Sequence, residues 1–272
     1  MHVHNFAAGP AMLPADVLEQ AQKELTDWQG LGMSVMETTH RGKAFIACAD
    51  HAEQALRSTL EIPDGYRVLF LQGGATGQFA AVPMNLTAPG DLVAYLNTGQ
   101  WSSKAVKAAK AQDAVVEVLA DEAASGYTTT PAAGSYEVPA AARYLHYTPN
   151  ETIGGVEFGY VPETGPVPLV ADMSSTILSR PIDVSRFGLI YAGAQKNMGP
   201  AGLVVVIVRD DLVGRARPTT PAIFDYAAMA QADSMVNTPP TFAIYLLGLT
   251  LDWIGRTGGL TAMAERNEAK AT

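Results

Sequence analysis

Residues 187–208 read FGLIYAGAQKNMGPAGLVVVIV and hold one charged side chain, Lys196, between two apolar runs. This pattern predicts buried strands over residues 189–192 and 202–208, joined by a tight glycine-rich connection. We therefore expect Lys196 at the end of a strand. An ammonium loses hydration there, which favours the neutral amine that attacks a carbonyl and forms a Schiff base. The alternative is a lysine that snorkels from a loop into water.

The composition indicates a globular protein whose partner is a small molecule. The chain has 272 residues, 48% of them hydrophobic, which is enough for one large domain or two modest ones. A formal net charge of −9 argues against nucleic acid or an anionic membrane as the main partner. No apolar stretch approaches the roughly 20 residues of a membrane span, and the N-terminus shows no targeting pattern, so we expect a cytoplasmic protein.

The cysteine and histidine content argues against disulfides and metal catalysis. Cys48 is the only cysteine, so an internal disulfide is excluded and a reducing compartment is expected. None of the five histidines stands in an HExxH or similar ligand spacing, and we expect no metal.

Distinctive side chains follow several other expected strands. Residues 66–71 form a strand that runs through Gly73-Gly74 into a helix, which either presents N–H groups to a phosphate or makes a plain tight turn. Trp101 lies in the loop between a strand at 91–96 and a helix at 104–112, where it serves packing or faces a planar ligand. Asp172 ends the strand at 167–171, and a buried carboxylate there needs a partner.

The alternation of strands and helices predicts an α/β fold with a mostly parallel sheet, in which ligands bind beyond the carboxyl ends of the strands. The Gly73-Gly74 turn, Trp101, Thr152, Asp172 and Lys196 all fall at that edge. Pyridoxal 5′-phosphate requires this set: amides for its phosphate, a face for its ring, an acid for its nitrogen and a lysine for its aldehyde. The combination favours a Schiff-base role for Lys196.

His40 and Arg41 stand beside Gly42 in a polar stretch. This indicates either a solvated turn or a clamp for a phosphate or carboxylate, because the guanidinium fork suits both anions.

Seven segments, in consistent order along the chain, resemble the phosphoserine aminotransferases, which are fold-type I pyridoxal-phosphate enzymes. They are residues 6–14 (FAAGPAMLP), 39–41 (THR), 78–86 (QFAAVPMNL), 97–102 (NTGQWS), 149–153 (PNETI), 171–175 (ADMSS) and 194–202 (AQKNMGPAG). The resemblance implies a mostly parallel sheet of seven strands with helices on both faces, and pyridoxal 5′-phosphate as cofactor.

The resemblance also implies roles for individual residues. Lys196 would form the Schiff base, Asp172 would pair with the pyridine nitrogen and Trp101 would stack on the ring. The other cofactor contacts would come from Ala75, Thr76, Thr152 and Gln195, with Asn237 and Thr238 reaching the phosphate of the neighbouring subunit. His40 and Arg41 would hold the substrate phosphate across the interface of a homodimer with shared active sites.

The implied reaction is reversible amino transfer between O-phospho-L-serine and 2-oxoglutarate, which gives 3-phosphohydroxypyruvate and L-glutamate in serine biosynthesis. Lys196 would shuttle the proton that leaves the substrate Cα. Some relatives also act in pyridoxine biosynthesis, and the sequence leaves open whether phosphohydroxythreonine is a second substrate.

The resemblance assigns residues 1–256 to a cofactor-binding large domain with an N-terminal arm. Residues 257–272 begin the connection to a smaller C-terminal domain, which this sequence lacks and which in the family supplies an arginine for the substrate α-carboxylate. The sequence is then either a fragment or a natural short form. In both cases we expect retained cofactor binding and severely weakened amino transfer.

Two alternatives differ in kind from an aminotransferase. One is a catalytically silent module that binds the cofactor and dimerises. The other is a different fold-type I enzyme, such as a cysteine desulfurase. Cys48 argues against the desulfurase, because it lies in a predicted helix and not on the mobile loop that such a nucleophile needs.

Overall fold

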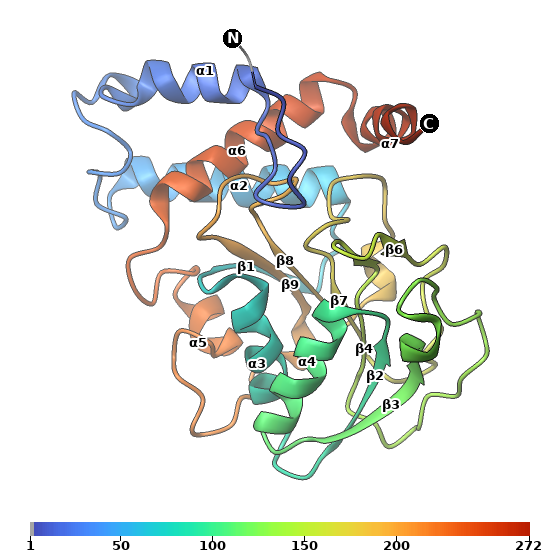
Figure 1. Cartoon of the computed structure of the whole chain (residues 1–272). Coiled ribbons are helices and arrows are strands. Elements are labelled where there is room, and N and C mark those ends of the chain that lie inside the picture. The colour runs from blue at the N-terminus through green and yellow to red at the C-terminus, as the bar shows by residue number, and fades with distance from the viewer. Residues whose placement is uncertain (1–2) are drawn as a thin grey trace.

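A seven-stranded mixed sheet forms the centre of the computed structural model, which describes residues 3–272 (Figure 1). In spatial order the strands are β1 (Tyr66–Leu71), β9 (Val204–Arg209), β8 (Leu189–Gly193), β7 (Leu169–Asp172), β4 (Leu145–Tyr147), β2 (Leu92–Asn97) and β3 (Val115–Asp121). Strands β8, β7, β4, β2 and β3 pair in parallel, and β9 is antiparallel to both β8 and β1. The expected α/β fold with a mostly parallel sheet is confirmed.

Helices cover both faces of the sheet, because its central strands are apolar on both sides. On one face pack α1 (Ala15–Glu24), α2 (Lys43–Leu60) and α6 (Thr241–Arg256); on the other pack α3 (Gly74–Leu86), α4 (Gln100–Ala111) and α5 (Tyr226–Gln231). In β9, Val205 and Ile207 join the first core, while Val204 and Val206 join the second. The sheet is therefore buried between two layers of helices.

The remaining elements are short or lie at the C-terminal end. They are the helix α7 (Gly259–Ala271), a separate hairpin of β5 (Asn150–Glu151) and β6 (Val156–Glu157), and the 3-10 turns η1 (Trp28–Gly30), η2 (Glu122–Ser125), η3 (Val184–Arg186) and η4 (Asp210–Leu212). No helix within residues 3–272 combines the length and the apolar character that a membrane crossing requires.

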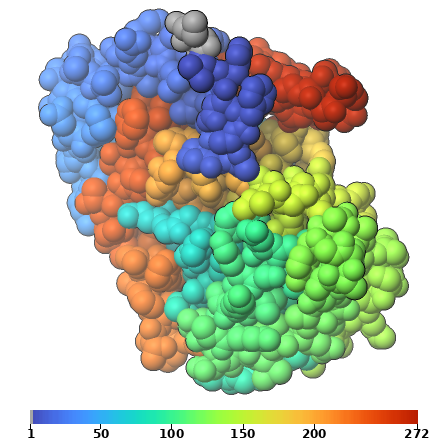
Figure 2. Space-filling model, in the orientation of Figure 1, coloured from blue at the N-terminus to red at the C-terminus, as the bar shows by residue number. Residues whose placement is uncertain are grey.

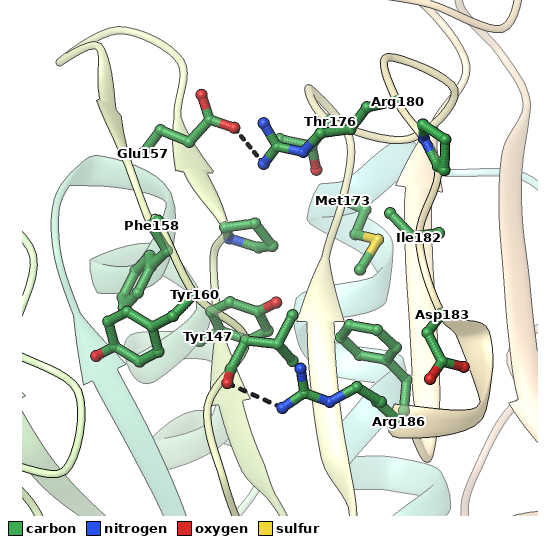
Figure 3. A pocket seen from close by; sticks show the side chains of 15 residues that line it. Tyr147, Glu157, Phe158, Tyr160, Met173, Thr176, Arg180, Ile182, Asp183 and Arg186 are labelled. Atoms are coloured by element: carbon green, nitrogen blue, oxygen red, sulfur yellow. Dashed lines mark hydrogen bonds and ion pairs between the residues drawn. The ribbon is translucent and has the colours of Figure 1, made fainter. Parts of the chain in front are cut away.

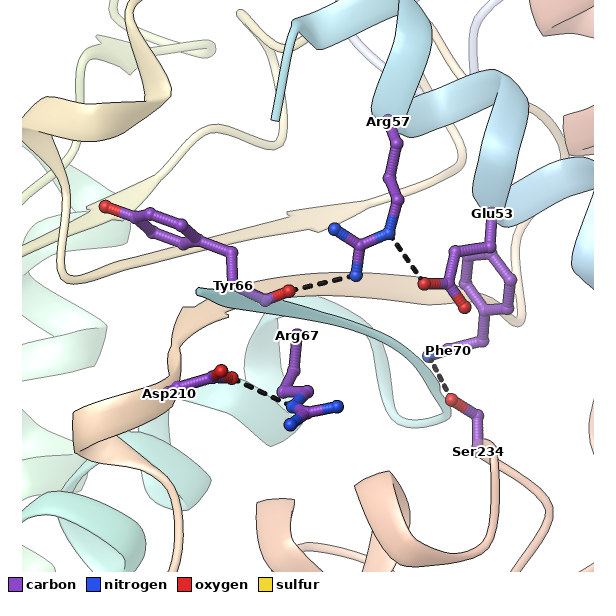
Figure 4. Close-up of polar contacts among 7 residues, drawn as sticks. All are labelled: Glu53, Arg57, Tyr66, Arg67, Phe70, Asp210 and Ser234. Atoms are coloured by element: carbon purple, nitrogen blue, oxygen red, sulfur yellow. Dashed lines mark hydrogen bonds and ion pairs between the residues drawn. The ribbon is translucent and has the colours of Figure 1, made fainter. Parts of the chain in front are cut away.

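The edge strand β1 is anchored by side chains on its open side (Figure 4). The Phe70 N–H donates to the Ser234 hydroxyl at 2.9 Å, and the Arg57 guanidinium donates to the Tyr66 carbonyl at 2.9 Å. Arg57 is itself held by Glu53, its neighbour one turn earlier in α2. These contacts satisfy backbone groups that an edge strand otherwise leaves without hydrogen-bond partners. They hold β1 in place, and with it the first residue of the turn that follows.

Strand β9 reverses direction because its connection to β8 is short. The link between Gly193 and Val204 carries Lys196 but no crossover helix, and two neighbouring strands joined this way pair antiparallel. The tight connection expected from the sequence is confirmed. It holds Lys196 at the carboxyl end of β8.

One helix boundary differs from the sequence prediction. The helix expected over 104–112 begins at Gln100, so Trp101 lies in its first turn and not in the preceding loop. The cause is a cap from a distant residue, Glu151, which satisfies the N–H groups of Trp101 and Ser102. Helix α1 ends at Glu24, and the chain then turns Trp28 into the core within η1.

The N-terminal arm, residues 3–14, forms a loop that descends from the level of α1 to the carboxyl end of β8 and returns to α1 (Figures 1 and 2). The Ala11 N–H donates to the Gln195 carbonyl at 2.8 Å. A Cβ at Gly9 would lie 3.3 Å from Lys196 Cε, and the φ of +150° also disfavours a side chain there. The arm thus covers the stem of Lys196.

Candidate active site

A pocket of about 150 Å³ lies at the carboxyl ends of the parallel strands, where ligands bind in open α/β sheets. Its walls come from the turn after β1, the start of α4, the segment after β4, the end of β7 and the β8–β9 connection. The lining residues are Gly74, Ala75, Thr76, Trp101, Thr148, Asn150, Thr152, Asp172, Ser174, Ser175, Gln195 and Lys196. The topology therefore brings together side chains from segments that are more than a hundred residues apart in the sequence.

The N-terminus of α3 forms one wall. Gly73, with a φ of +90°, makes the left-handed turn from β1 into the helix, and Ala75 and Thr76 follow in the first helical turn. The first N–H groups of a helix have no partner within it, and the helix dipole adds a partial positive charge. This wall can bind the oxygen atoms of a phosphate.

Asp172 is a buried carboxylate at the end of β7. Its Oδ1 accepts from the Ser174 hydroxyl at 2.6 Å and from the Ser174 N–H at 3.0 Å, while Oδ2 has no hydrogen-bond partner among residues 3–272. Burial raises the pKa of Asp172 to about 6, although the Ser174 hydrogen bonds and the positive charge of Lys196 oppose this. The free oxygen can pair with a protonated ring nitrogen, which would favour the ionised form.

Lys196 is half-buried, and its Nζ donates a hydrogen bond to the Thr152 hydroxyl. Burial lowers the pKa of Lys196, whereas the negative charges of Asp172 and Glu151 raise it. The lowering prevails, so the neutral amine is more accessible than in a free lysine. This is the state that a nucleophilic or proton-transferring lysine needs.

Buried polar atoms without partners indicate that the pocket is built for a polar ligand. Trp101 Nε1, Thr148 Oγ1 and Asn150 Oδ1 are buried, line the pocket and make no hydrogen bond within residues 3–272. Buried polar groups are almost always hydrogen-bonded in proteins, so such a cluster requires an explanation. A planar ring with polar substituents and a phosphate would supply the missing partners, and the residues present therefore fit pyridoxal 5′-phosphate.

The structure brings together seven of the residues predicted from the sequence: Ala75, Thr76, Trp101, Thr152, Asp172, Gln195 and Lys196. It does not bring His40, Arg41, Asn237 or Thr238 to this pocket. Arg41 is exposed and His40 is partly exposed. Asn237 and Thr238 are also exposed, and they lie beside the turn that follows β1. There the Gln72 side-chain amide donates to the Thr238 carbonyl at 3.1 Å. Their action on a neighbouring subunit stays a prediction.

Four lining residues had no predicted role: Thr148, Asn150, Ser174 and Ser175. A signal existed for Ser174, because a serine two residues after an aspartate commonly hydrogen-bonds back to the carboxylate. Thr148 and Asn150 follow β4 directly, so their position at the strand's carboxyl end was also readable from the sequence. Ser175, whose hydroxyl donates to the Asn150 carbonyl at 3.1 Å, had no such signal.

A larger cavity of about 600 Å³ lies between residues 147–161, which include the end of β4 and the strand β6, and residues 173–187, which connect β7 to β8 (Figure 3). Tyr147 and Phe187, from the core beneath α2 and α6, line it together with Arg180 and Arg186. Each arginine already pairs with a glutamate, at 2.5 and 2.6 Å. Neither Lys196 nor Asp172, whose pKa values are shifted by burial, lines this cavity. We therefore take the smaller pocket, which both residues line, as the candidate active site.

Replacing Ser174 with alanine should weaken cofactor binding roughly tenfold, the usual effect of losing one hydrogen bond to a charged group. The Asp172 carboxylate would lose its shorter hydrogen bond, so its pKa should rise further. Fluorescence titration of the cofactor-free protein measures this. Ser185→Ala is the matched control, because Ser185 bonds to Asp183 in the same Asp-x-Ser geometry away from the pocket. Equal binding by the two variants would contradict a role for Ser174.

The sequence and the fold are both similar to one group of enzymes. The profile described as aminotransferase class-V matches residues 3–272. A phosphoserine aminotransferase from Laribacter hongkongensis is 55% identical over 271 residues, covering 100% of this chain and 75% of the relative. One from Azotobacter vinelandii is 57% identical over 266 residues, covering 98% and 73%.

Two solved structures agree. Phosphoserine aminotransferase from Bacillus circulans subsp. alkalophilus has a TM-score of 0.96 and 48% identity, covering 99% of this chain and 74% of that one. The PLP-bound phosphoserine aminotransferase from Trichomonas vaginalis has a TM-score of 0.92 and 41% identity, covering 99% and 76%. The chain belongs to the class-V aminotransferases and, within them, to the phosphoserine aminotransferase family.

Proposed function

We propose that this protein is a pyridoxal-phosphate-dependent aminotransferase that exchanges the amino group between O-phospho-L-serine and 2-oxoglutarate. The products are 3-phosphohydroxypyruvate and L-glutamate. The observation that carries the proposal is the pocket itself. It combines Lys196, whose pKa is lowered, the buried Asp172 and the N-terminus of α3 with buried polar atoms that have no hydrogen-bond partner among residues 3–272. The identity to phosphoserine aminotransferases over nearly the whole chain supports the choice of substrate.

Each wall of the pocket would hold one part of the cofactor. The N–H groups of Ala75 and Thr76, with Gln195, would hold the phosphate; Trp101 would cover the ring; and Asp172 would pair with the ring nitrogen. Thr152, which already bonds to Lys196, would also donate to the ring hydroxyl. When bound, pyridoxal 5′-phosphate supplies an electron sink for the pair left behind when the substrate Cα–H bond breaks.

Lys196 would first bind the cofactor aldehyde covalently and then, once displaced by the substrate amine, act as the general base. Its Nζ would carry the proton that leaves the substrate Cα. The lowered pKa supports both roles, because each begins from the neutral amine. The N-terminal arm at Gly9 covers the lysine stem and would help to exclude water from it.

The complete site is proposed to need two subunits, with His40 and Arg41 holding the substrate phosphate and Asn237 and Thr238 reaching the cofactor phosphate across the interface. Arg41 has no ion-pair partner among residues 3–272. The Nε2 atom of His40 is buried and has no hydrogen-bond partner among the same residues. Most of the exposed large apolar side chains in the described chain lie within residues 3–46, among them Phe6, which is 93% exposed. Apolar exposure concentrated in one region supports a protein contact there.

We also propose the domain division expected from the sequence. Residues 1–256, of which 1 and 2 lie outside the described residues, would be the cofactor-binding domain, and 257–272 would begin the connection to a smaller domain. The continuous core from α1 to α6 supports the first part, and α7, in which Leu260 is the one buried residue, supports the second.

Exposure of the cofactor-loaded protein to single amino acids tests the proposal. O-phospho-L-serine should convert the visible absorbance of the bound cofactor to that of the pyridoxamine form, and 2-oxoglutarate should reverse the change. L-serine should react at least roughly a hundredfold more slowly, because the phosphate contributes charge-assisted hydrogen bonds that serine cannot make. Equal rates for the two amino acids would contradict the substrate assignment. Cofactor binding without any conversion would contradict the proposed activity and favour the catalytically silent cofactor-binding module.

A further inference from the structure

Glu151 is a fully enclosed carboxylate beside the pocket, in a position to which neither the sequence pattern nor the proposed chemistry gives a role. It belongs to β5, is 2% exposed and forms no ion pair within residues 3–272. A buried charge of this kind persists only where hydrogen bonds or dipoles compensate it.

The compensation comes from the N-terminus of α4. Glu151 Oε2 accepts from the Trp101 N–H at 2.9 Å, and Oε1 accepts from the Ser102 N–H at 2.8 Å and the Ser102 hydroxyl at 2.7 Å. The residue that precedes the helix, Gly99, has no side chain with which to cap it. The carboxylate therefore caps α4 from fifty residues away in the sequence, where the helix dipole also favours a negative charge.

The absence of a side chain at Gly99 leaves the space that the Glu151 carboxylate occupies. A Cβ there would lie 2.6 Å from Glu151 Cδ and 2.8 Å from Oε2, distances at which the glutamate would have to move. Only glycine lets the carboxylate lie against the backbone of the first turn.

The residue held by this contact is Trp101. Its backbone N–H is one of the bonded donors, and its side chain lines the pocket with Lys196 Nζ 6.0 Å from the ring centroid. Its Nε1 is among the orphaned buried atoms. A shift of the first turn of α4 would thus move the indole directly.

We propose that Glu151 is a positioning residue, whose carboxylate fixes the first turn of α4 and so holds the Trp101 indole in place for the cofactor ring. The inference rests on the proposed function, because it presumes that Trp101 covers the ring. Glu151 does not line the pocket, so it would act through Trp101.

The test uses pyridoxamine 5′-phosphate, which has the ring and phosphate but no aldehyde, so the chemistry of Lys196 does not enter the result. Two variants disturb the contact in different ways: Glu151→Gln removes the charge and places an N–H₂ group against N–H donors, while Gly99→Ala keeps the charge and displaces the carboxylate. Asp225→Asn is the matched control, because Asp225 caps α5 through the Ala227 and Ala228 N–H groups outside the pocket.

We expect each of the first two variants to bind pyridoxamine 5′-phosphate roughly tenfold more weakly, as for the loss of one charge-assisted hydrogen bond. The circular dichroism of the bound ring should also shrink, and acrylamide should quench Trp101 more readily in the ligand-free protein. A Trp101→Phe chain gives the contribution of Trp28 and Trp253 to that fluorescence. Asp225→Asn should leave binding and dichroism unchanged.

Unchanged dissociation constant and dichroism in Gly99→Ala would overturn the inference, and this variant decides the matter if Glu151→Gln does not fold. A loss of binding in Asp225→Asn as large as in the other two would also overturn it, because the effect would then be general destabilisation. Failure of the unsubstituted protein to bind pyridoxamine 5′-phosphate is a different result, which contradicts the proposed function itself.

Discussion

Replacing Lys196 with alanine is expected to slow amino transfer at least about a thousandfold, because the group that takes the proton from the substrate Cα is lost. The fold should survive. Lys196 makes one side-chain hydrogen bond, to Thr152, and its burial disfavours its own charge. Alanine removes that unfavourable desolvation, so the cofactor-free variant should be at least as stable as the unsubstituted protein at neutral pH.

Single-turnover kinetics with O-phospho-L-serine measure the first effect, and urea denaturation of the cofactor-free proteins measures the second. Lys104→Ala provides the control, because its ammonium lies 4.3 Å from the centroid of the same Trp101 ring yet does not line the pocket. Loss of Lys104 should leave the rate within a few-fold of the original. A Lys196→Ala protein that retained more than a tenth of the rate would exclude Lys196 as the general base.

Replacing Asp172 with asparagine is expected to reduce activity and to raise the stability of the cofactor-free protein. Removing one partner of a buried charged pair costs about 3–5 kcal/mol, which at the transition state corresponds to roughly a thousandfold in rate. Asparagine keeps the acceptor that Ser174 uses but cannot keep a ring nitrogen protonated. Activity should fall while stability rises, because the buried carboxylate is needed to bind the cofactor but destabilises the cofactor-free fold.

The stability effect depends on pH with a sign that follows from burial. The pKa of Asp172 rises from 3.8 to about 6 in the folded protein, so between these values the folded state binds a proton that the unfolded state has released. Stability of the cofactor-free protein therefore falls as pH increases from about 4 to about 6, and the loss is complete above that range. At 1.36 kcal/mol per pKa unit the total is about 3 kcal/mol.

Urea denaturation of the cofactor-free protein at pH 8 should thus show Asp172→Asn as the more stable form, by up to about 3 kcal/mol, and at pH 4 the difference should vanish. Asp183→Asn is the control, because Asp183 makes the same pair of contacts to a following serine but is exposed. A stability gain that persists unchanged at pH 4 would show that the burial of charge is not its cause.

The sheet and the central residues of the site could be predicted because their signals are local. The run Tyr66–Leu71 is a strand with the expected bounds, since a short apolar run followed by two glycines leaves few other structures. Lys196 and Asp172 were recognisable as single charged groups at the ends of apolar runs. In a parallel sheet, that position alone brings distant residues to one edge.

The remaining features depend on contacts between distant segments. Trp101 was expected in a loop because Gly99 has no side chain that could cap a helix at Gln100; the N–H groups of Trp101 and Ser102 are capped by Glu151, fifty residues later. The placement of His40 and Arg41 at a site was not resolvable either, because their predicted target belongs to a second subunit. Local patterns carry no information about either kind of contact.

Borohydride reduction of the cofactor-loaded protein, followed by peptide mass spectrometry, tests the central assignment most directly. Borohydride converts a reversible link between an aldehyde and an amine into a stable one, so it marks the lysine that holds the cofactor. We predict that the peptide containing Lys196 gains the mass of the reduced phosphopyridoxyl group and that the peptides containing Lys104 and Lys107 do not. Modification of another lysine in place of Lys196, or of none, would contradict the account of the pocket given above.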